Sequence, residues 1–395
     1  MGESRTPPDP QIPFAQRPIV ILGAGIIGCA TARQLLLNGF PVVLVAEYLP
    51  GDTNMHYASA WAGAAWHAAG GITADQRYFQ AITHRHLLKM AQEEPKSGVC
   101  IVDTREYLEQ APPANSSLWG QHVVSKFRHL SRGEFPDNFN CAWGYDTLVT
   151  DPTVHMPYLG ERIKAMGGQF IRKRVQSLDE LYHMFPESSL FINASGIGSR
   201  DLTDVRDSLC FPERGQNVFY KTENCHRMYF RNGKEYTYII PRPLSKGVVL
   251  GGVKQQDNLY VYSIPSLAPL SFVPLPRLSH LFFFFFFFNP RSKMTDFYRS
   301  PEVDMAIARD EISRAHILAP EIVPESPPDD SLQHIIGIRP SRKGGFRLES
   351  EQRGQHIVLS AYGFGGGGYA FSYGIADALA KMVEKAEREN VIDTQ

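Results

Sequence analysis

Three glycines at fixed spacing lie near the start of the chain, directly after a short run of β-branched residues. Gly23, Gly25 and Gly28 follow Ile19 to Leu22. In this pattern the first glycine permits a tight turn, the second lets the backbone approach a diphosphate, and the third allows a helix to pack closely on a strand. The spacing therefore predicts a turn that binds the phosphates of a dinucleotide.

The residues after this turn supply the rest of a dinucleotide site. Ile26 and Ile27 open an apolar stretch that stops at Asn38-Gly39, so we expect a helix whose first N–H groups face the phosphates. A second β-branched run, 42–45, leads into Glu47, nineteen positions beyond the last glycine of the turn. A carboxylate at this place accepts hydrogen bonds from a ribose diol. The pattern predicts half of a βαβαβ unit and does not choose between FAD and NAD.

Later segments are expected to complete the same sheet. They alternate between strand-type and helix-type patterns, which is typical of a parallel sheet covered by helices. The predicted elements are a helix at 154–166, strands at 170–175, 190–194 and 356–359, a glycine-rich turn at 363–368 and a helix at 373–388.

The segments between them have a different pattern. Residues 75–148 and 213–253 contain alternating β-type runs, which favour an antiparallel sheet. We therefore predict an α/β fold in which a Rossmann-type dinucleotide-binding domain carries an inserted antiparallel α+β substrate domain. The predicted boundaries are 1–17 for a disordered tail, 18–74, 149–205 and 335–390 for the discontinuous dinucleotide-binding domain, and 75–148 and 206–334 for the substrate domain, with 260–298 as an atypical insertion.

Composition points to a small-molecule partner. Forty basic and forty-one acidic residues leave a net charge of −1, which gives no field that would recruit nucleic acid or an anionic membrane. The five cysteines are widely spaced and contain no C-x-x-C, so neither a disulfide framework nor a zinc site is expected. His67, His84 and His86 have no ligand spacing that would complete a metal site, and no metal is predicted.

Six further segments resemble signatures of the D-amino-acid oxidase family, in the family's order and over almost the whole chain from Ile19 to Glu387. They are Tyr57-Ala58-Ser59-Ala60-Trp61-Ala62-Gly63-Ala64, Asn193-Ala194-Ser195-Gly196-Ile197-Gly198, Arg214-Gly215-Gln216, Tyr238-Ile239-Ile240-Pro241, Gly337-Ile338-Arg339-Pro340 and Tyr362-Gly363-Phe364-Gly365-Gly366-Gly367-Gly368-Tyr369.

This resemblance implies that the dinucleotide is FAD and that the first domain is a Rossmann-type FAD-binding domain. It further implies an oxidase whose reduced flavin is reoxidised by O₂ to give H₂O₂. The residues expected to contact the cofactor are Gly23, Gly25, Ile26, Ile27, Gly28, Glu47, Ser59, Ala62, Gly63, Ala64, Val175, Ser195, Gly196, Arg339, Gly365, Gly366, Gly367, Gly368 and Tyr369.

The substrate residues follow from the chemistry of a D-amino acid. Its carboxylate enters a mostly apolar pocket and needs a charged, hydrogen-bonding partner. Arg339 is the candidate for a bidentate contact, and Tyr238 for a phenolic hydrogen bond to the same group. Backbone carbonyls near Gly366 are expected to accept from the substrate amine. The residue types alone also allow a surface salt bridge for Arg339 and a half-buried strand aromatic for Tyr238.

Lys254, which follows the Gly251-Gly252 pair, is the candidate residue for substrate preference. The resemblance implies that a cationic residue here favours D-aspartate, so D-aspartate oxidase is the nearest alternative. A solvated lysine at a strand end is the simpler interpretation. Glycine or sarcosine oxidase is a more distant alternative. A non-catalytic FAD-binding relic is another, because the 260–298 segment interrupts the substrate domain.

That segment contains seven consecutive phenylalanines, Phe282 to Phe288, within a Pro- and Ser-rich stretch. It has neither the alternation of a strand nor the length of a membrane span. We interpret it as a retained intron and expect its deletion to raise soluble yield without loss of FAD.

The ends of the chain bear on location. The first seventeen residues lack the apolar core of a signal peptide, so an intracellular protein is expected. The family resemblance implies a peroxisome, but Val391 to Gln395 is not an S-K-L type signal, which leaves the cytoplasm open. No membrane association is expected, and a homodimer is one possible state.

Overall fold

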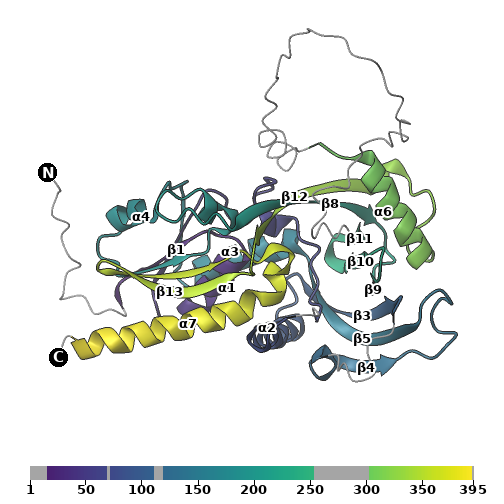
Figure 1. Ribbon diagram of the computed structural model, residues 1–395, viewed down its shortest axis with the longest axis horizontal. Coiled ribbons are helices and arrows are strands. Elements are labelled where there is room, and N and C mark those ends of the chain that lie inside the picture. The colour runs from purple at the N-terminus through teal and green to yellow at the C-terminus, as the bar shows by residue number, and fades with distance from the viewer. Residues whose placement is uncertain (1–15, 69–71, 111–118, 253–301, 394–395) are drawn as a thin grey trace, which may run out of the picture.

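The computed structural model describes residues 16–68, 72–110, 119–252 and 302–393. Two sheets lie side by side along the long axis of the molecule, one of six strands and one of eight (Figure 1). Lys254 and the 260–298 segment lie outside the described residues, so the predictions made for them stay predictions.

The six-stranded sheet has the order β13-β14-β7-β1-β2-β6. Its strands pair in parallel except for the β13–β14 hairpin. The central strands are fully buried, as expected for a parallel sheet covered on both faces, and this is why they are continuous apolar runs. The bounds are β1 Ile19–Leu22, β2 Val42–Ala46, β6 Gln169–Arg172, β7 Leu190–Asn193, β13 Arg347–Arg353 and β14 His356–Tyr362.

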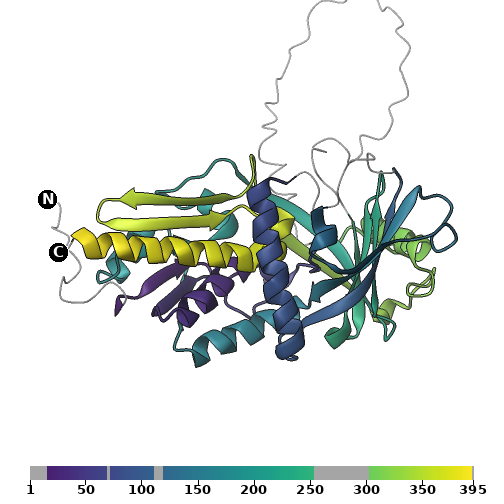
Figure 2. The same cartoon turned by 90° about the horizontal axis from the view of Figure 1, so that it is seen from below.

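Helices cover this sheet on both sides. On one face a single apolar core contains residues of α1 (Ile26–Leu37), α2 (Ala74–Glu93), α3 (Pro152–Ala165) and α7 (Gly368–Asp393). The short α4 (Leu178–Met184) packs against the opposite face. Figure 2 shows α2 crossing beside the end of α7 that is farthest from the C-terminus.

Local signals fix where several of these helices begin. The Thr73 hydroxyl accepts a hydrogen bond from Gln76 N, and the Gln76 side chain accepts one from Thr73 N. The two residues thus form a capping box at the start of α2. Asp151 caps α3, whose first residue is Pro152. Such caps satisfy N–H groups that have no partner inside the helix.

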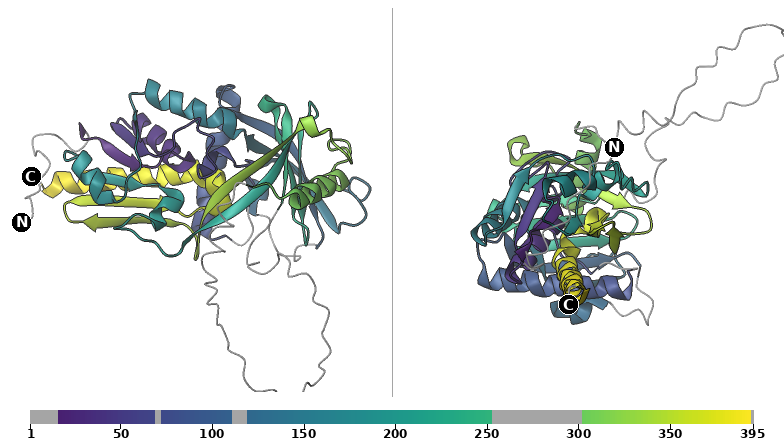
Figure 3. Two further views of the ribbon diagram at one scale, coloured as in Figure 1. Left: turned by 90° about the horizontal axis from the view of Figure 1, so that it is seen from above. Right: turned by 90° about the vertical axis from the view of Figure 1, so that its left-hand side faces the viewer.

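The eight-stranded sheet has the order β12-β8-β11-β10-β9-β3-β5-β4 and is antiparallel except for the β3–β9 pair. One face packs against α6 (Met305–Leu318), which Figure 3 shows at the outer side of the sheet. The bounds are β3 Val99–Leu108, β4 Ser125–His129, β5 Cys141–Thr150, β8 Cys210–Lys221, β9 Arg227–Asn232, β10 Thr237–Arg242, β11 Gly247–Gly251 and β12 Leu332–Arg342.

Short 3₁₀ turns connect these elements and carry several of the predicted site residues. They are η2 Ala58–Ala60, η3 Trp119–His122, η4 Gly196–Arg200, η5 Pro243–Ser245, η6 Asp329–Ser331 and η7 Gly365–Gly367. No helix in the described part of the chain has both the length and the apolar character needed to cross a bilayer.

The structure agrees with the predicted fold class and differs from three finer predictions. Residues 74–93, expected within a β-rich segment, form a long helix that packs in the core of the six-stranded sheet. β12, assigned in part to the dinucleotide-binding domain, pairs with β8 along its whole length. The last helix begins at Gly368 and not at Tyr373, because the glycine run already has a helical backbone.

Candidate active site

The glycine turn has the predicted strand–turn–helix structure. Gly23 has a φ of +105°, and a Cβ at this position would lie 2.4 Å from the Ala194 carbonyl oxygen. A Cβ at Gly28 would lie 2.0 Å from the Gly23 carbonyl oxygen, so only glycine allows α1 to pack this closely on the turn. The turn is therefore built as a dinucleotide-binding turn requires.

The N-terminus of α1 has the character of an anion site. Gly25 precedes the helix, makes no side-chain cap, and no acidic residue stands in the first turn. Free N–H groups and the helix dipole at such an end favour a phosphate. One of these donors, Ile26 N, is held by the Ser59 hydroxyl at 2.9 Å.

The predicted flavin-facing segment, residues 57–64, lies against this turn. The Tyr57 hydroxyl donates to the Ala24 carbonyl at 2.6 Å, and the Tyr369 hydroxyl donates to the Ser59 carbonyl at 2.8 Å. Burial raises the pKa of both phenols, so they stay protonated as donors. Three distant parts of the sequence, the glycine turn, segment 57–64 and the start of α7, thus meet at one place.

Glu47 stands directly after β2, at the edge of the sheet where parallel strands end. Its carboxylate is 41% exposed and lies 3.7 Å from Arg174 Nε. Because a contact of this length leaves carboxylate lone pairs available, Glu47 can accept from a ribose diol. Val175, the next predicted contact in this region, is buried in the apolar core on the α4 side of the sheet.

Ser195 and Gly196 follow β7 of the six-stranded sheet and lie against β12 of the eight-stranded sheet. Asn193 Oδ1 accepts from Ser195 N at 3.2 Å, and the hydroxyls of Ser195 and Ser199 lie 2.8 Å apart. Gly196 has a φ of +59°, and a Cβ there would lie 3.5 Å from Pro340 Cβ. The loop after β7 is therefore placed beside β12, next to Arg339.

The glycine run from Gly365 to Gly368 also links the two sheets. Gly365 has a φ of +54°, and a Cβ there would lie 3.0 Å from Ser341 Oγ. Cβ atoms at Gly366 and Gly368 would lie 3.8 Å from Arg339 Cδ and 3.5 Å from Ile26 Cγ2. The run is a 3₁₀ turn that leads straight into α7.

The side chain of Arg339 lies over Gly215 of β8, where a Cβ would come within 2.9 Å of Arg339 Cζ. Its side chain is 24% exposed, and its Nη1 lies 3.5 Å from Glu213 Oε1 on the paired strand. Glu213 is also engaged by the Ser341 hydroxyl, at 2.7 Å from Oε2. Since the ion pair is single and long, the planar fork of Arg339 keeps donors for a second, bidentate carboxylate.

Tyr238 lies close enough to Arg339 for that charge to act on its phenol. Burial raises the pKa of Tyr238, and the Arg339 guanidinium opposes this rise. The Tyr238 hydroxyl donates to Asn217 Oδ1 at 2.7 Å. Gly251, paired with Tyr238, leaves room for the ring, because a Cβ there would lie 2.6 Å from two ring carbons. Arg339 and Tyr238 are thus brought together, whereas Lys254 lies outside the described residues.

Sequence reasoning missed Arg242, at the end of β10. It is 4% exposed, and its Nε and Nη2 donate to the carbonyls of Gly63 and Ala62 at 2.8 and 2.7 Å. An arginine after a proline at a strand end gives no signal of burial. Only the contact with segment 57–64 reveals its place in the site.

A second unexpected group is Glu311, which is fully buried on α6. Neither carboxylate oxygen has a hydrogen-bond partner among the described residues. Burial raises the pKa of Glu311 to about 9, although Arg314 opposes the rise. We also find no group of three or more His, Cys, Asp or Glu side chains that could hold a metal within the described part of the chain.

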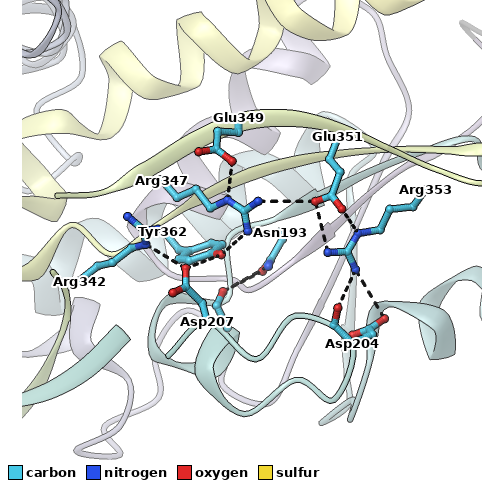
Figure 4. A network of polar contacts seen from close by, with 10 residues as sticks. Asn193, Asp204, Asp207, Arg342, Arg347, Glu349, Glu351, Arg353 and Tyr362 are labelled. Carbon is cyan, nitrogen blue, oxygen red and sulfur yellow. Dashed lines mark hydrogen bonds and ion pairs between the residues drawn. The ribbon is translucent and has the colours of Figure 1, made fainter. Parts of the chain in front are cut away.

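A polar network links the end of β12 to β13 and β14 (Figure 4). Asp207 Oδ2 accepts from Arg342 Nε at 2.9 Å and from the Tyr362 hydroxyl at 3.0 Å. Arg347 Nη1 donates to the Tyr362 hydroxyl at 2.9 Å. Because Arg342 ends β12, the strand that carries Arg339, the network holds that end of the eight-stranded sheet against β13 and β14 of the six-stranded sheet.

Comparison with known proteins decides the family. A family model described as FAD dependent oxidoreductase matches residues 18–382. The chain belongs to this family. FAD is its cofactor, and the residues at the α1 N-terminus fit this group, because the glycine cradle at Gly23 and Gly28 admits no Cβ and the helix end carries no acidic residue.

Individual relatives of this FAD dependent oxidoreductase cover nearly its whole length. A D-amino-acid oxidase of Schizosaccharomyces pombe is 28% identical over 369 residues, which cover 91% of this chain and 94% of that one. A D-aspartate oxidase of Talaromyces thermophilus is 29% identical over 405 residues, which cover 94% and 96%.

Solved structures with lower identity share the fold. A glycine oxidase from Geobacillus kaustophilus has a TM-score of 0.61 at 14% identity, covering 94% of this chain and 95% of that one. An L-amino acid deaminase from Proteus vulgaris has a TM-score of 0.61 at 14% identity, covering 96% of each chain. These likenesses establish the two-sheet architecture of an FAD dependent oxidoreductase and leave the substrate open.

Proposed function

We propose that this chain is an oxidase that deaminates D-amino acids. The observation that carries the proposal is the pairing of Arg339 with Tyr238 beside the Gly365–Gly368 turn, which itself reaches the N-terminus of α1. This arrangement supports a cofactor that would begin at α1 and bring its reactive end to Arg339, which would bind the substrate carboxylate.

The proposed reaction is a two-electron oxidation. When bound, FAD would supply two-electron redox chemistry at the substrate Cα, with O₂ as the final acceptor that yields H₂O₂. The substrate would react as its neutral amine, after its ammonium group has lost one proton to water. Loss of the Cα hydride then converts the Cα–N bond to a C=N bond, and water hydrolyses the imino acid to a 2-oxo acid and ammonia. No side chain has to act as an acid or base, so the protein contributes mainly orientation, which can supply several kcal/mol.

The side chains would divide the work of orientation. Arg339 would bind the substrate carboxylate through two parallel N–H donors, and Tyr238 would turn its hydroxyl from Asn217 to the same carboxylate. Carbonyls near Gly366 would accept from the substrate amine. These contacts hold two substituents of Cα, the carboxylate and the amine, so that the Cα hydrogen of one enantiomer would face the cofactor.

The remaining predicted contacts would hold FAD. Gly23, Gly25 and Gly28 with Ile26 and Ile27 would bind the diphosphate, and Glu47 the adenosine ribose. Backbone groups of the predicted flavin segments would line the ring; these comprise Ser59, Ala62, Gly63, Ala64, Ser195, Gly196 and Gly365 to Tyr369. Val175 would contribute an apolar contact near the adenosine end.

An acidic substrate is the second candidate. It is supported by the Talaromyces thermophilus relative, which is named a D-aspartate oxidase. If Lys254 faces a second carboxylate, kcat/KM for D-aspartate relative to D-alanine should fall when Lys254 is replaced by Met. A ratio that does not change would assign general D-amino-acid oxidase.

The proposal is tested by a panel of D- and L-amino acids with peroxide as the readout. We expect peroxide with D-enantiomers, including D-alanine or D-aspartate, and none above background with their L-enantiomers. Peroxide formation from glycine or sarcosine alone would assign the chain to the more distant alternative.

A further inference from the structure

Arg242 is buried among groups that do not neutralise it. Its side chain shares one face of β10 with Tyr238 and Ile240, since residues two apart on a strand point to the same side. The face of the Phe219 ring lies 5.7 Å from its Cζ. Burial lowers the pKa of Arg242, and the charge of Asp151 only partly offsets this effect.

Asp151 is itself committed to other partners. Its Oδ1 accepts from Thr153 N at 3.1 Å and from the Thr153 hydroxyl at 2.7 Å, and its Oδ2 accepts from the Ser245 hydroxyl. Within the described parts of the chain, Arg242 makes no ion pair with a carboxylate. An isolated buried cation is costly, so a site that keeps one favours a negative partner.

The two carbonyls to which Arg242 donates belong to segment 57–64. This segment runs between the glycine turn and the strand that carries Arg339. Near its start, this segment contacts the glycine turn through Tyr57 and Ser59. Further along, Trp61 lies against Gly337, two residues before Arg339, where a Cβ would be 2.7 Å from Trp61 Cβ. A cofactor that extends from α1 to Arg339 must pass this segment.

The two hydrogen bonds also set how the segment presents its backbone. The Ala62 carbonyl points to Arg242, and the C=O and N–H of a trans peptide point in opposite directions. The N–H of Gly63 is therefore directed away from Arg242. Removing the guanidinium would leave both carbonyls without these donors, while the backbone pairing of Ala64 with Thr150 would still hold the end of the segment.

From these contacts we propose that Arg242 is a positioning residue of the FAD site. It orients the Ala62–Gly63 backbone through two carbonyls, and it supplies a buried positive charge that favours negatively charged forms of the flavin. The inference rests on FAD as the cofactor and does not depend on the proposed D-amino acid substrate. The N-terminus of α7 is a separate source of positive potential and remains when Arg242 is replaced.

Sulfite binding to the oxidised holoenzyme tests the charge. Sulfite adds to oxidised flavin and leaves a negative charge on the ring, so its affinity reports the positive potential at the cofactor without any substrate. In Arg242→Met we expect the sulfite Kd to rise by about tenfold or more.

The control for the sulfite experiment is Arg314→Met. Arg314 is 9% exposed on α6 and also donates to backbone, at Tyr236 O, but from the opposite face of the sheet. The sulfite Kd of the Arg314→Met variant should stay at the wild-type value.

Binding of FAD to the apoprotein tests the positioning, and Arg242→Lys separates the two roles. Lysine keeps the charge but cannot donate to both carbonyls with a planar fork. We expect Arg242→Lys to bind sulfite as the wild type does while its Kd for FAD rises by about fivefold. A wild-type sulfite Kd in Arg242→Met would contradict the proposed electrostatic role of Arg242. An unchanged FAD Kd in Arg242→Lys would contradict its proposed role in positioning the Ala62–Gly63 backbone. If Arg242→Met does not fold, a sulfite Kd raised tenfold in Arg242→Lys, which keeps the charge, would contradict the electrostatic role.

Discussion

The guanidinium of Arg339 lies over Gly215 of the neighbouring strand, so closely that a Cβ at position 215 would come within 2.9 Å of Arg339 Cζ and Nη2. Gly215 thus gives Arg339 the kind of close approach that the glycine turn gives to α1. It leaves space that a side chain would fill. Because the tip of an arginine can move, a substitution at Gly215 is expected to shift Arg339 more than it disturbs the fold.

We therefore predict that Gly215→Ala raises KM for the best D-amino acid by roughly 10- to 100-fold, since displacement of a binding group by about 1 Å has effects of this size. Steady-state kinetics measure this effect. FAD content and thermal stability should match the wild type, which separates a displaced arginine from an unfolded protein. A wild-type KM in Gly215→Ala would mean that Arg339 does not bind substrate.

Replacement of Arg339 itself should depend on the shape of the cation as well as its charge. Arg339→Lys should lose nearly as much as Arg339→Leu, about 2–5 kcal/mol of substrate binding, because an ammonium cannot make two parallel donors. The loss should appear mainly in KM. If Arg339→Leu keeps a KM near the wild type for its best substrate, the assignment of the carboxylate site is wrong.

Loss of the Glu47 carboxylate should weaken FAD and leave the fold intact. Glu47→Ala is expected to cost about 1–3 kcal/mol of FAD affinity, because the ribose diol loses its acceptor. Fluorescence titration of apoprotein with FAD measures this loss. Glu161→Ala, which removes an exposed carboxylate from α3, is the control and should bind FAD normally. Equal affinities in the wild type and Glu47→Ala would contradict the ribose contact.

Because of the Asp207 network, the free energy of unfolding should depend on pH under acidic conditions. Burial raises the pKa of Asp207, but the hydrogen bonds from Arg342, Leu209 N and Tyr362 outweigh this effect and hold it below the ordinary value of 3.8. A lowered carboxyl pKa stabilises the folded state above the unfolded pKa, and this stabilisation disappears as pH falls through the folded one. Asp207→Asn should therefore lose about 1–3 kcal/mol at pH 7, and less as the solution is acidified below about pH 4.

Thermal unfolding of both proteins across this pH range measures the difference. Asp137→Asn is the matched control, because the Asp137 side chain is 97% exposed. A gap between wild type and Asp207→Asn that stays constant from neutral to acid pH would show that the charge of Asp207 contributes nothing.

Local signals in the sequence account for much of the fold and of the cofactor site. The glycine turn, the helix after it and Glu47 were predictable, because turn geometry, helix start and strand end all lie within about thirty residues. α2 was missed because its buried residues include Gln80, Thr83 and His84, which hide the apolar stripe. The pairing of β12 with β8 joins residues more than a hundred positions apart, and no local pattern encodes it.

The same limit applies to single residues of the site. Gly215 lies in one of the segments that carry the family resemblance and Arg242 directly follows another, but these segments do not show what either residue contacts. Their importance comes from what the fold brings near them, Arg339 in one case and the Ala62–Gly63 carbonyls in the other. The contact partners of Gly215 and Arg242 are far away in the sequence, so the neighbouring residues do not reveal them.

Anaerobic mixing of the purified holoenzyme with single enantiomers tests the central claim most directly. The visible flavin absorbance should bleach on addition of D-alanine or D-aspartate and should persist with the L-enantiomers, and Arg339→Leu should bleach far more slowly at the same substrate concentration. Admission of O₂ should restore the absorbance and release H₂O₂. Flavin that is bound and reducible by dithionite, yet is bleached by no D-amino acid, would contradict the account and leave a protein that binds FAD without this catalysis.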